Sequence, residues 1–137
     1  MIYPMFGMVV LTAVVLVTLF RSRVSAVRRA LVPFSYFGIY QGAVEPEFIA
    51  KPSRHFANLF ETPVLFYVAC LAAMTTRNGG PVMQAFAWIY VAARIAHAYV
   101  HLGSNRIRHR LRAYFFSCLV LLSMWIYLVL AISMSRA

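Results

Sequence analysis

Charged side chains are scarce in this sequence. Only 12% of its 137 residues are Asp, Glu, Lys or Arg, about half of the roughly 25% usual in a soluble protein, whereas 63% are hydrophobic. Acidic residues are the scarcest, with 3 against 13 Lys and Arg. This composition excludes an ordinary soluble domain and predicts a single membrane domain over residues 1–137.

Four apolar segments are long enough to cross a bilayer, which needs about 20 mostly apolar residues per helix. They cover residues 2–20, 55–76, 82–103 and 113–134, which is most of the chain. The first segment lacks the basic n-region and the small-residue cleavage site of a signal peptide, so we expect a retained helix. The predicted fold is therefore all-α, an integral membrane four-helix bundle with the lipid bilayer as its partner.

Basic residues cluster in two of the connections between these segments. Five lie within residues 21–53 and four within residues 104–112, whereas the short turn has only Arg77 and the tails have only Arg136. The positive-inside rule then places both long connections in the cytoplasm and both termini outside. This clustering also argues against nucleic acid as the partner of the net charge of +10.

Prolines mark the second segment. Pro52 and Ser53 are expected to begin its helix, with Ser53 as the N-cap. Pro63 lies inside the segment, where it removes a backbone hydrogen bond and is expected to kink the helix.

A polar stripe follows this N-terminal signal. Arg54, Asn58 and Glu61 stand at i, i+4 and i+7, so on a helix they lie within about 40° of one another. A polar stripe this narrow on an apolar helix must face something other than hydrocarbon, and ionisable groups inside a membrane bundle indicate a functional site.

A second stripe lies in the third segment and comprises Tyr90, Arg94, His97 and His101. The tight turn at residues 78–81 predicts that the second and third helices form an antiparallel hairpin. Pairing them about that turn brings Glu61 to the depth of His97 and within one turn of Arg94. The two stripes therefore predict one site in the cytoplasmic half of the membrane. His55 and His109 are expected at the membrane interface.

Two simpler interpretations of the stripes stay open. Buried polar networks in membrane proteins sometimes only fix the register of the helices, although such a role needs one or two groups rather than six. His97 and His101 with Glu61 opposite resemble a metal-ligand set. Nearby arginines would repel a dication, so no metal is expected.

The chemistry of the stripes favours a small zwitterionic ligand with extra carboxylates. Guanidinium groups bind carboxylates through paired hydrogen bonds, Glu61 can receive a cationic group, and the Asn58 amide can donate or accept. Glutathione, with two carboxylates, one ammonium and a thiol, has this arrangement.

The pattern Arg54-x-x-x-Asn58-x-x-Glu61 at the start of a second span resembles the signature of one membrane protein family. This is the family of membrane-associated proteins in eicosanoid and glutathione metabolism (MAPEG), which includes microsomal glutathione transferases and leukotriene synthases. Arg94 and the four-span layout are similar as well, so the resemblance covers nearly the whole chain. It implies a homotrimer, with glutathione bound between neighbouring subunits near the cytoplasmic surface. It also implies a bacterial-type member, so we expect the protein in a bacterial inner membrane.

The resemblance also implies roles for single residues. The expected glutathione-binding residues are Arg54, Asn58, Glu61, Arg94, His97 and His101. Arg108 falls where family members have the arginine that activates the thiol, and Arg28 or Arg29 is the nearest counterpart of an assisting arginine. The sequence departs from the pattern where His97 and His101 replace two tyrosines and Thr62 replaces an aromatic residue.

The implied function is a membrane-bound glutathione transferase or peroxidase, with glutathione as co-substrate and a hydrophobic electrophile that arrives from the lipid. A non-catalytic membrane binding or scaffold protein of the same fold is an alternative. A small proton-coupled multidrug transporter that uses Glu61 is a weaker alternative, because the essential glutamate of such transporters lies in the first helix, which has no acid here.

Overall fold

The computed structural model describes the backbone of residues 1–42 and 44–136 and their side chains up to residue 134. Within those ranges the chain forms helices and no strands, which confirms the all-α prediction. The helices are α1 (Ile2–Arg28), α2 (Tyr36–Ile39), α3 (Glu47–Asn58), α4 (Thr62–Thr75), α5 (Pro81–Leu102) and α6 (Ile107–Arg136).

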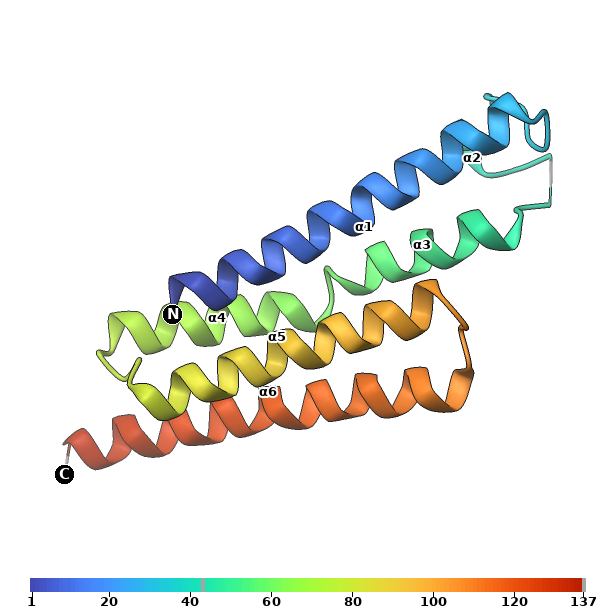
Figure 1. Cartoon of the computed structure of the whole chain (residues 1–137). Coiled ribbons are helices and arrows are strands. Elements are labelled where there is room, and N and C mark those ends of the chain that lie inside the picture. Colours follow the sequence, from blue (N-terminus) through green and yellow to red (C-terminus); the bar gives the residue numbers. More distant parts are fainter. Residues whose placement is uncertain (43, 137) are drawn as a thin grey trace.

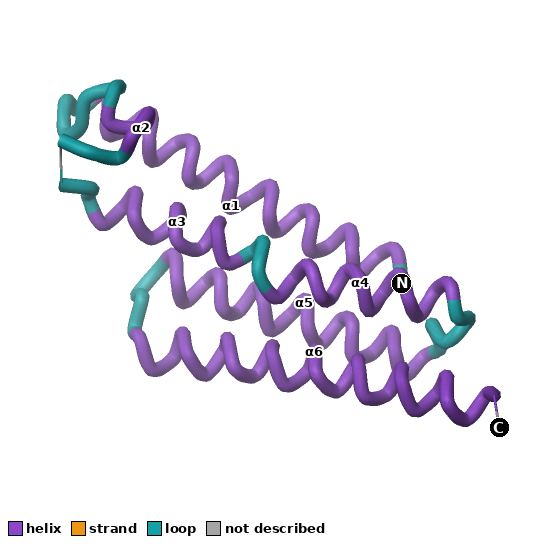
Figure 2. The backbone as a smooth tube through the Cα atoms, turned by 180° about the vertical axis from the view of Figure 1, so that it is seen from behind, coloured by secondary structure: helices purple, strands orange, loops and turns teal. Residues whose placement is uncertain are grey.

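The long helices lie side by side in an elongated bundle. Helix α1 runs along α3 and α4, and α5 packs against both that pair and α6 (Figure 1). The start of α1 and the end of α6 lie at one end of the bundle. The segment between α1 and α3 and the turn between α5 and α6 lie at the other end, as the reverse view also shows (Figure 2). The two most basic connections therefore share one end of the molecule.

In the described part of the chain, three stretches are long and apolar enough to cross a membrane: Ile2–Arg28, Glu47–Thr75 and Ile107–Met134. Their outward faces carry large exposed apolar side chains, among them Phe6, Phe20 and Leu119, and a surface of this kind is typical of contact with lipid. Helix α5 is not among the three stretches. It carries Arg94 and His97, and both side chains are buried within the bundle.

The second predicted span is broken rather than kinked. Helix α3 begins at Glu47 after Pro46 and ends at Asn58, and α4 begins at Thr62. The prediction of Ser53 as the N-cap is therefore wrong, because the helix has already run for more than a turn when it reaches Ser53. Pro63 lies in the first turn of α4. Its ring would clash with the carbonyl four residues earlier and it has no N–H, so a regular α-helix is disfavoured through this point.

Aromatic packing joins α4 to α5 on the C-terminal side of the break between α3 and α4. The rings of Phe66 on α4 and Tyr90 on α5 stack with centroids 4.5 Å apart, and both side chains are fully buried. The hydroxyl of Tyr90 donates to Thr62 Oγ1 over 3.4 Å. Tyr90 from the predicted stripe therefore belongs to the core, where it ties α5 to the first residue of α4.

Candidate functional site

The helix break opens a polar cavity beside α5 and the start of α6. Its volume is about 270 Å³, and it is lined by Arg54, Asn58, Glu61, His97, His101, Arg110, Leu111 and Tyr114. Five of the six residues expected to bind the ligand thus line one cavity. Arg94 lies behind the lining and is fully buried. The cavity lies close to the turn between α5 and α6, because it is lined by His101 in the last turn of α5 and Arg110 in the first turn of α6. That turn lies at one end of the bundle (Figure 1).

Asn58 links the buried arginine to the glutamate. Arg94 Nη2 donates to Asn58 Oδ1 over 2.6 Å and to the Asn58 carbonyl over 3.3 Å. The amide nitrogen of Asn58 donates in turn to Glu61 Oε2 over 2.7 Å. The sequence predicts that Glu61 lies within one turn of Arg94, and the structure places the Asn58 amide between them. This arrangement fixes which way the amide points, because only its oxygen can accept from the guanidinium.

The break itself presents Glu61 to the cavity. Asn58 is the last residue of α3, and Glu61 precedes α4 with φ −93° and ψ −102°. Arg54 lies one turn before Asn58, and the side chains of Arg54 and Glu61 are both exposed. The cavity therefore has a cationic and an anionic group on its rim with the fixed amide between them. A ligand that carries both a carboxylate and an ammonium group complements this arrangement.

The structure does not bring Arg108 into this cavity. Helix α6 begins at Ile107, six residues before the predicted span, and Arg108 in its first turn is exposed. Arg110 lines the cavity instead, and its Nη1 donates to Asn105 Oδ1 over 3.0 Å. Tyr114 follows Arg110 by one turn, and its ring lies 5.9 Å from the guanidinium carbon of Arg94. The sequence analysis does not include Arg110, because it places residues 104–112 in a connection, or Tyr114, which lies at the start of the predicted span 113–134. Once α6 is known to begin at Ile107, their i, i+4 spacing places both on one face.

Three imidazoles form the inner wall of the site. The ring centroid of His55 lies 5.2 Å from that of His97 and 5.0 Å from that of His101. The expectation of an interfacial His55 is wrong, because the side chain is fully buried. Helix α3 starts early enough to place His55 in its third turn, facing α5. Among the described residues, no three His, Cys, Asp or Glu side chains are placed to hold a metal ion.

These features define a class of helical membrane proteins that have a polar cavity at a break in a segment long enough to span the membrane. The model of the MAPEG family matches residues 1–130, and the chain belongs to that family. The resemblance inferred from the Arg-Asn-Glu pattern is therefore confirmed. Membership indicates a membrane protein with glutathione-related transferase or peroxidase chemistry at the level of the family. Neither the curated proteins nor the solved structures contain a match to the chain.

Proposed function

We propose that the protein is a membrane-bound glutathione transferase or peroxidase that activates the glutathione thiol for attack on an apolar electrophile. The observation that carries this proposal is the cavity at the helix break, where Arg54, Glu61 and Arg110 lie around a fixed Asn58 amide. Glutathione enters the proposal as co-substrate, and no metal takes part in it.

Arg54 and Glu61, the two charged residues on the rim of the cavity, bind different groups of glutathione. Arg54 binds a glutathione carboxylate, for which the guanidinium offers two parallel donors. Glu61 binds the ammonium group through the carboxylate oxygen that Asn58 leaves free, since Asn58 donates to Oε2. His97 and His101 complete the wall with one donor or acceptor at each ring nitrogen. Family membership and the charge pattern of the cavity support this assignment.

The reaction requires a thiolate, and a guanidinium beside the sulfur stabilises it. An opposite charge lowers the pKa of a thiol from its ordinary value of about 8.5. The thiolate attacks the electrophile, a carbon–sulfur bond forms, and the leaving group departs with the electron pair. With a hydroperoxide, the sulfur attacks the terminal oxygen, the O–O bond breaks, and the alkoxide leaves and takes up a proton to give the alcohol. The resulting sulfenic acid reacts with a second glutathione to give the disulfide and water. The resemblance assigns the activating role to Arg108, whereas Arg110 is the arginine that reaches the cavity from α6.

We further propose a homotrimer of four-helix protomers in a bacterial inner membrane, with α5 as the fourth span. Family membership supports both the assembly and the span count. Neighbouring protomers would cover part of the exposed apolar surface of α1 and α6, and the crevice between them would admit the electrophile from the lipid.

The direct test is calorimetric titration of glutathione into the detergent-solubilised protein. We expect saturable binding of glutathione. The diamide of glutathione, in which both carboxylates are blocked, should not bind, because it offers Arg54 no anion. Absence of glutathione binding at millimolar concentrations would overturn the proposal.

A non-catalytic binding protein of the same fold is a second candidate, and one observation favours it. His97 and His101 occupy the wall where the resemblance has two tyrosines. This candidate predicts glutathione binding without turnover of either an aryl halide or a lipid hydroperoxide. Turnover of either electrophile above the uncatalysed rate excludes it.

The membrane orientation gives a further prediction. The start of α1 and the end of α6 lie at one end of the bundle (Figure 2), and the basic connections at the other end favour the cytoplasm. A phosphatase that is active only outside the cytoplasm should therefore be active when fused after Ala137. A cytoplasm-dependent fluorescent protein at the same position should stay dark. The reversed pair of results would invert the orientation and move the site to the outer half of the membrane.

A further inference from the structure

His55 lies behind the inner wall of the cavity and takes no part in the proposed chemistry. Its side chain is fully buried, and neither of its ring nitrogens has a hydrogen-bond partner among the described residues. Buried polar atoms in folded proteins are nearly always paired. The two nitrogens of His55 therefore require partners within the bundle.

Two neighbouring rings can supply these partners. His97 and His101 are 3% and 6% exposed, and the Nδ1 atom of each is buried without a partner in the part of the chain that the structure describes. Their ring centroids lie 5.2 and 5.0 Å from that of His55. An N–H···N bond of about 2.9–3.0 Å between two imidazoles places the centroids roughly 5 Å apart. Because rotation about the Cβ–Cγ bond exchanges nitrogen and carbon positions while the ring centre stays in place, His55 can bond to both rings where they stand.

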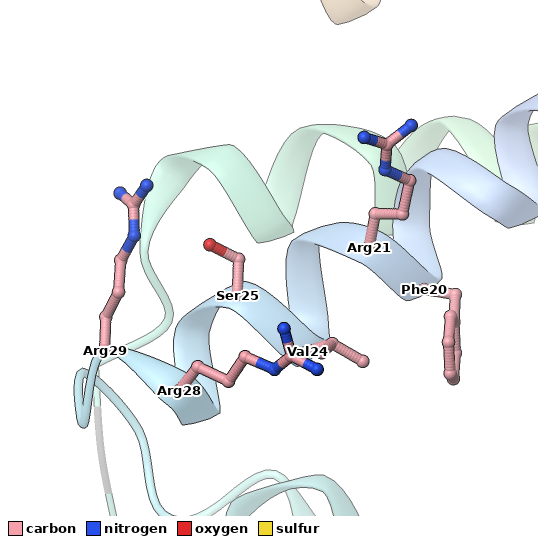
Figure 3. Close-up of a pocket in the computed structure, with 6 residues that line it drawn as sticks. All are labelled: Phe20, Arg21, Val24, Ser25, Arg28 and Arg29. Atoms are coloured by element: carbon pink, nitrogen blue, oxygen red, sulfur yellow. The ribbon is translucent and has the colours of Figure 1, made fainter.

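Positive charges surround the three rings. Guanidiniums reach them from three helices, with Arg54 on α3, Arg94 on α5 and Arg110 on α6. Glu61 is the one carboxylate in the described lining of the cavity, and the arginines at the end of α1 project around a different cavity of the chain (Figure 3). A further positive charge would be repelled here. Each ring is therefore a neutral imidazole, with one donor and one acceptor.

A neutral His55 that bonds to both neighbours links their protonation. It donates its single N–H to the Nδ1 atom of one neighbour and accepts a proton from the Nδ1 atom of the other. The first neighbour then carries its own proton on Nε2, and the second carries it on Nδ1. His97 and His101 are thus opposite tautomers, so that one presents an N–H donor to the cavity and the other presents a lone pair.

We propose that His55 is a positioning residue that holds His97 and His101 in opposite tautomers, with the Nε2–H of His101 directed at the bound thiolate. Arg94 can only donate and is the charged neighbour with the strongest effect on His97, which favours a lone pair on that ring. Arg110 is the corresponding neighbour of His101, so a donor on that ring meets the same anion as the Arg110 guanidinium. This inference rests on the glutathione site proposed above, and it adds the residue that decides which hydrogen bonds the inner wall offers.

Nitrogen-15 NMR of the detergent-solubilised protein with labelled histidine tests the tautomers without any ligand. We expect the proton on Nε2 in His101 and on Nδ1 in His97. His55→Phe keeps a ring in the same space but has no nitrogen, so the difference between the two wall histidines should disappear. The same tautomer at both positions in the wild type overturns the proposal, and this spectrum decides the matter even where the phenylalanine variant does not fold.

The thiol gives a second readout. A hydrogen bond to a charged group contributes about tenfold or more, so His55→Phe should raise the pKa of the bound glutathione thiol and lower its acid dissociation constant about tenfold. The value of kcat should fall by a similar factor with KM nearly unchanged, because less of the bound thiol ionises. His55→Gln should restore most of both, since its amide has a donor and an acceptor. The matched control His109→Phe removes an exposed imidazole from α6 and should change neither quantity.

The outcomes separate this role from simpler ones. If His55→Phe and His55→Gln lose turnover to the same extent, His55 serves packing alone and the proposal is overturned. An unchanged thiol pKa in His55→Phe also overturns it. Absence of glutathione binding by the wild type would overturn the proposed function and the thiolate contact with it, whereas the opposite tautomers are decided by the spectrum of the free protein.

Discussion

Arg110→Ala should lower the turnover of glutathione with an electrophile by about 10²–10³-fold, the usual cost of removing one preorganised electrostatic donor. Arg110 lines the cavity, and its guanidinium is steadied by Asn105 at 3.0 Å. Binding should weaken much less, because the rim charges of Arg54 and Glu61 remain. The measurement is a pair of titrations: calorimetry for affinity, and thiolate absorbance against pH for the bound thiol. Loss of the guanidinium should raise the pKa of the thiol.

Arg108→Ala is the matched control, since it removes the same side chain two residues away. Arg108 is exposed and lies outside the cavity, so its loss should leave the thiol pKa unchanged and alter turnover little. The opposite outcome, a large loss at Arg108 and little at Arg110, would restore the role that the resemblance assigns to Arg108. Arg108 would then act on a thiol bound outside the cavity of its own chain, since it is not among the residues that line that cavity.

The different positions of Arg108 and Arg110 relative to the cavity could not be predicted from hydropathy alone. Hydropathy locates a span by its apolar residues, and the first turns of α6 hold Arg108, Arg110 and Arg112. The sequence therefore suggested a loop there, although the helix begins at Ile107. Polar first turns are compatible with a membrane helix that extends beyond the hydrocarbon. Arg110 lies one turn before Tyr114 on the same helical face, but this can be inferred only when the helix is known to extend back to Ile107.

The break between α3 and α4 was only partly predictable for a related reason. The prediction of a kink rested on Pro63, whose local effect on a helix is general. How far the chain departs from helical geometry depends on contacts from other elements. Arg94 on α5 draws in the Asn58 amide and carbonyl, and Asn58 holds Glu61. Periodicity correctly indicated a shared face for Arg54 and Asn58, but it treated Glu61 as a further position on one continuous helix.

The same tertiary dependence explains His55. His55 is the first residue of the predicted second span, where a histidine is usually solvated, so the sequence analysis assigned His55 no role in the site. In the structure, α3 extends back to Glu47 and turns His55 toward His97 and His101 on α5. The three rings come from two helices, and single-segment periodicity cannot report such a meeting. The inner wall of the site is therefore a product of helix packing.

Glu61→Gln should abolish most glutathione binding while the fold persists. Gln keeps the shape of Glu, and its amide oxygen can still accept the hydrogen bond that Asn58 donates to Glu61 over 2.7 Å in the wild type. The helix break should therefore keep its internal contacts. The charge that would receive the ligand's ammonium is lost. A hydrogen bond to a charged group contributes about 1.5–3 kcal/mol, which predicts a loss of about 10–150-fold in affinity by calorimetric titration.

The control is Glu47→Gln, which removes a second of the three carboxylates. Glu47 lies in the first turn of α3 and pairs with Lys51 over 2.9 Å, remote from the cavity lining. An exposed pair of this kind contributes little to stability, so this variant should bind glutathione normally. If Glu61→Gln instead fails to insert or to assemble while Glu47→Gln does both, Glu61 serves the packing of the bundle. In that case the fold itself requires the charge of Glu61, and the polar stripe serves to fix the register of the helices.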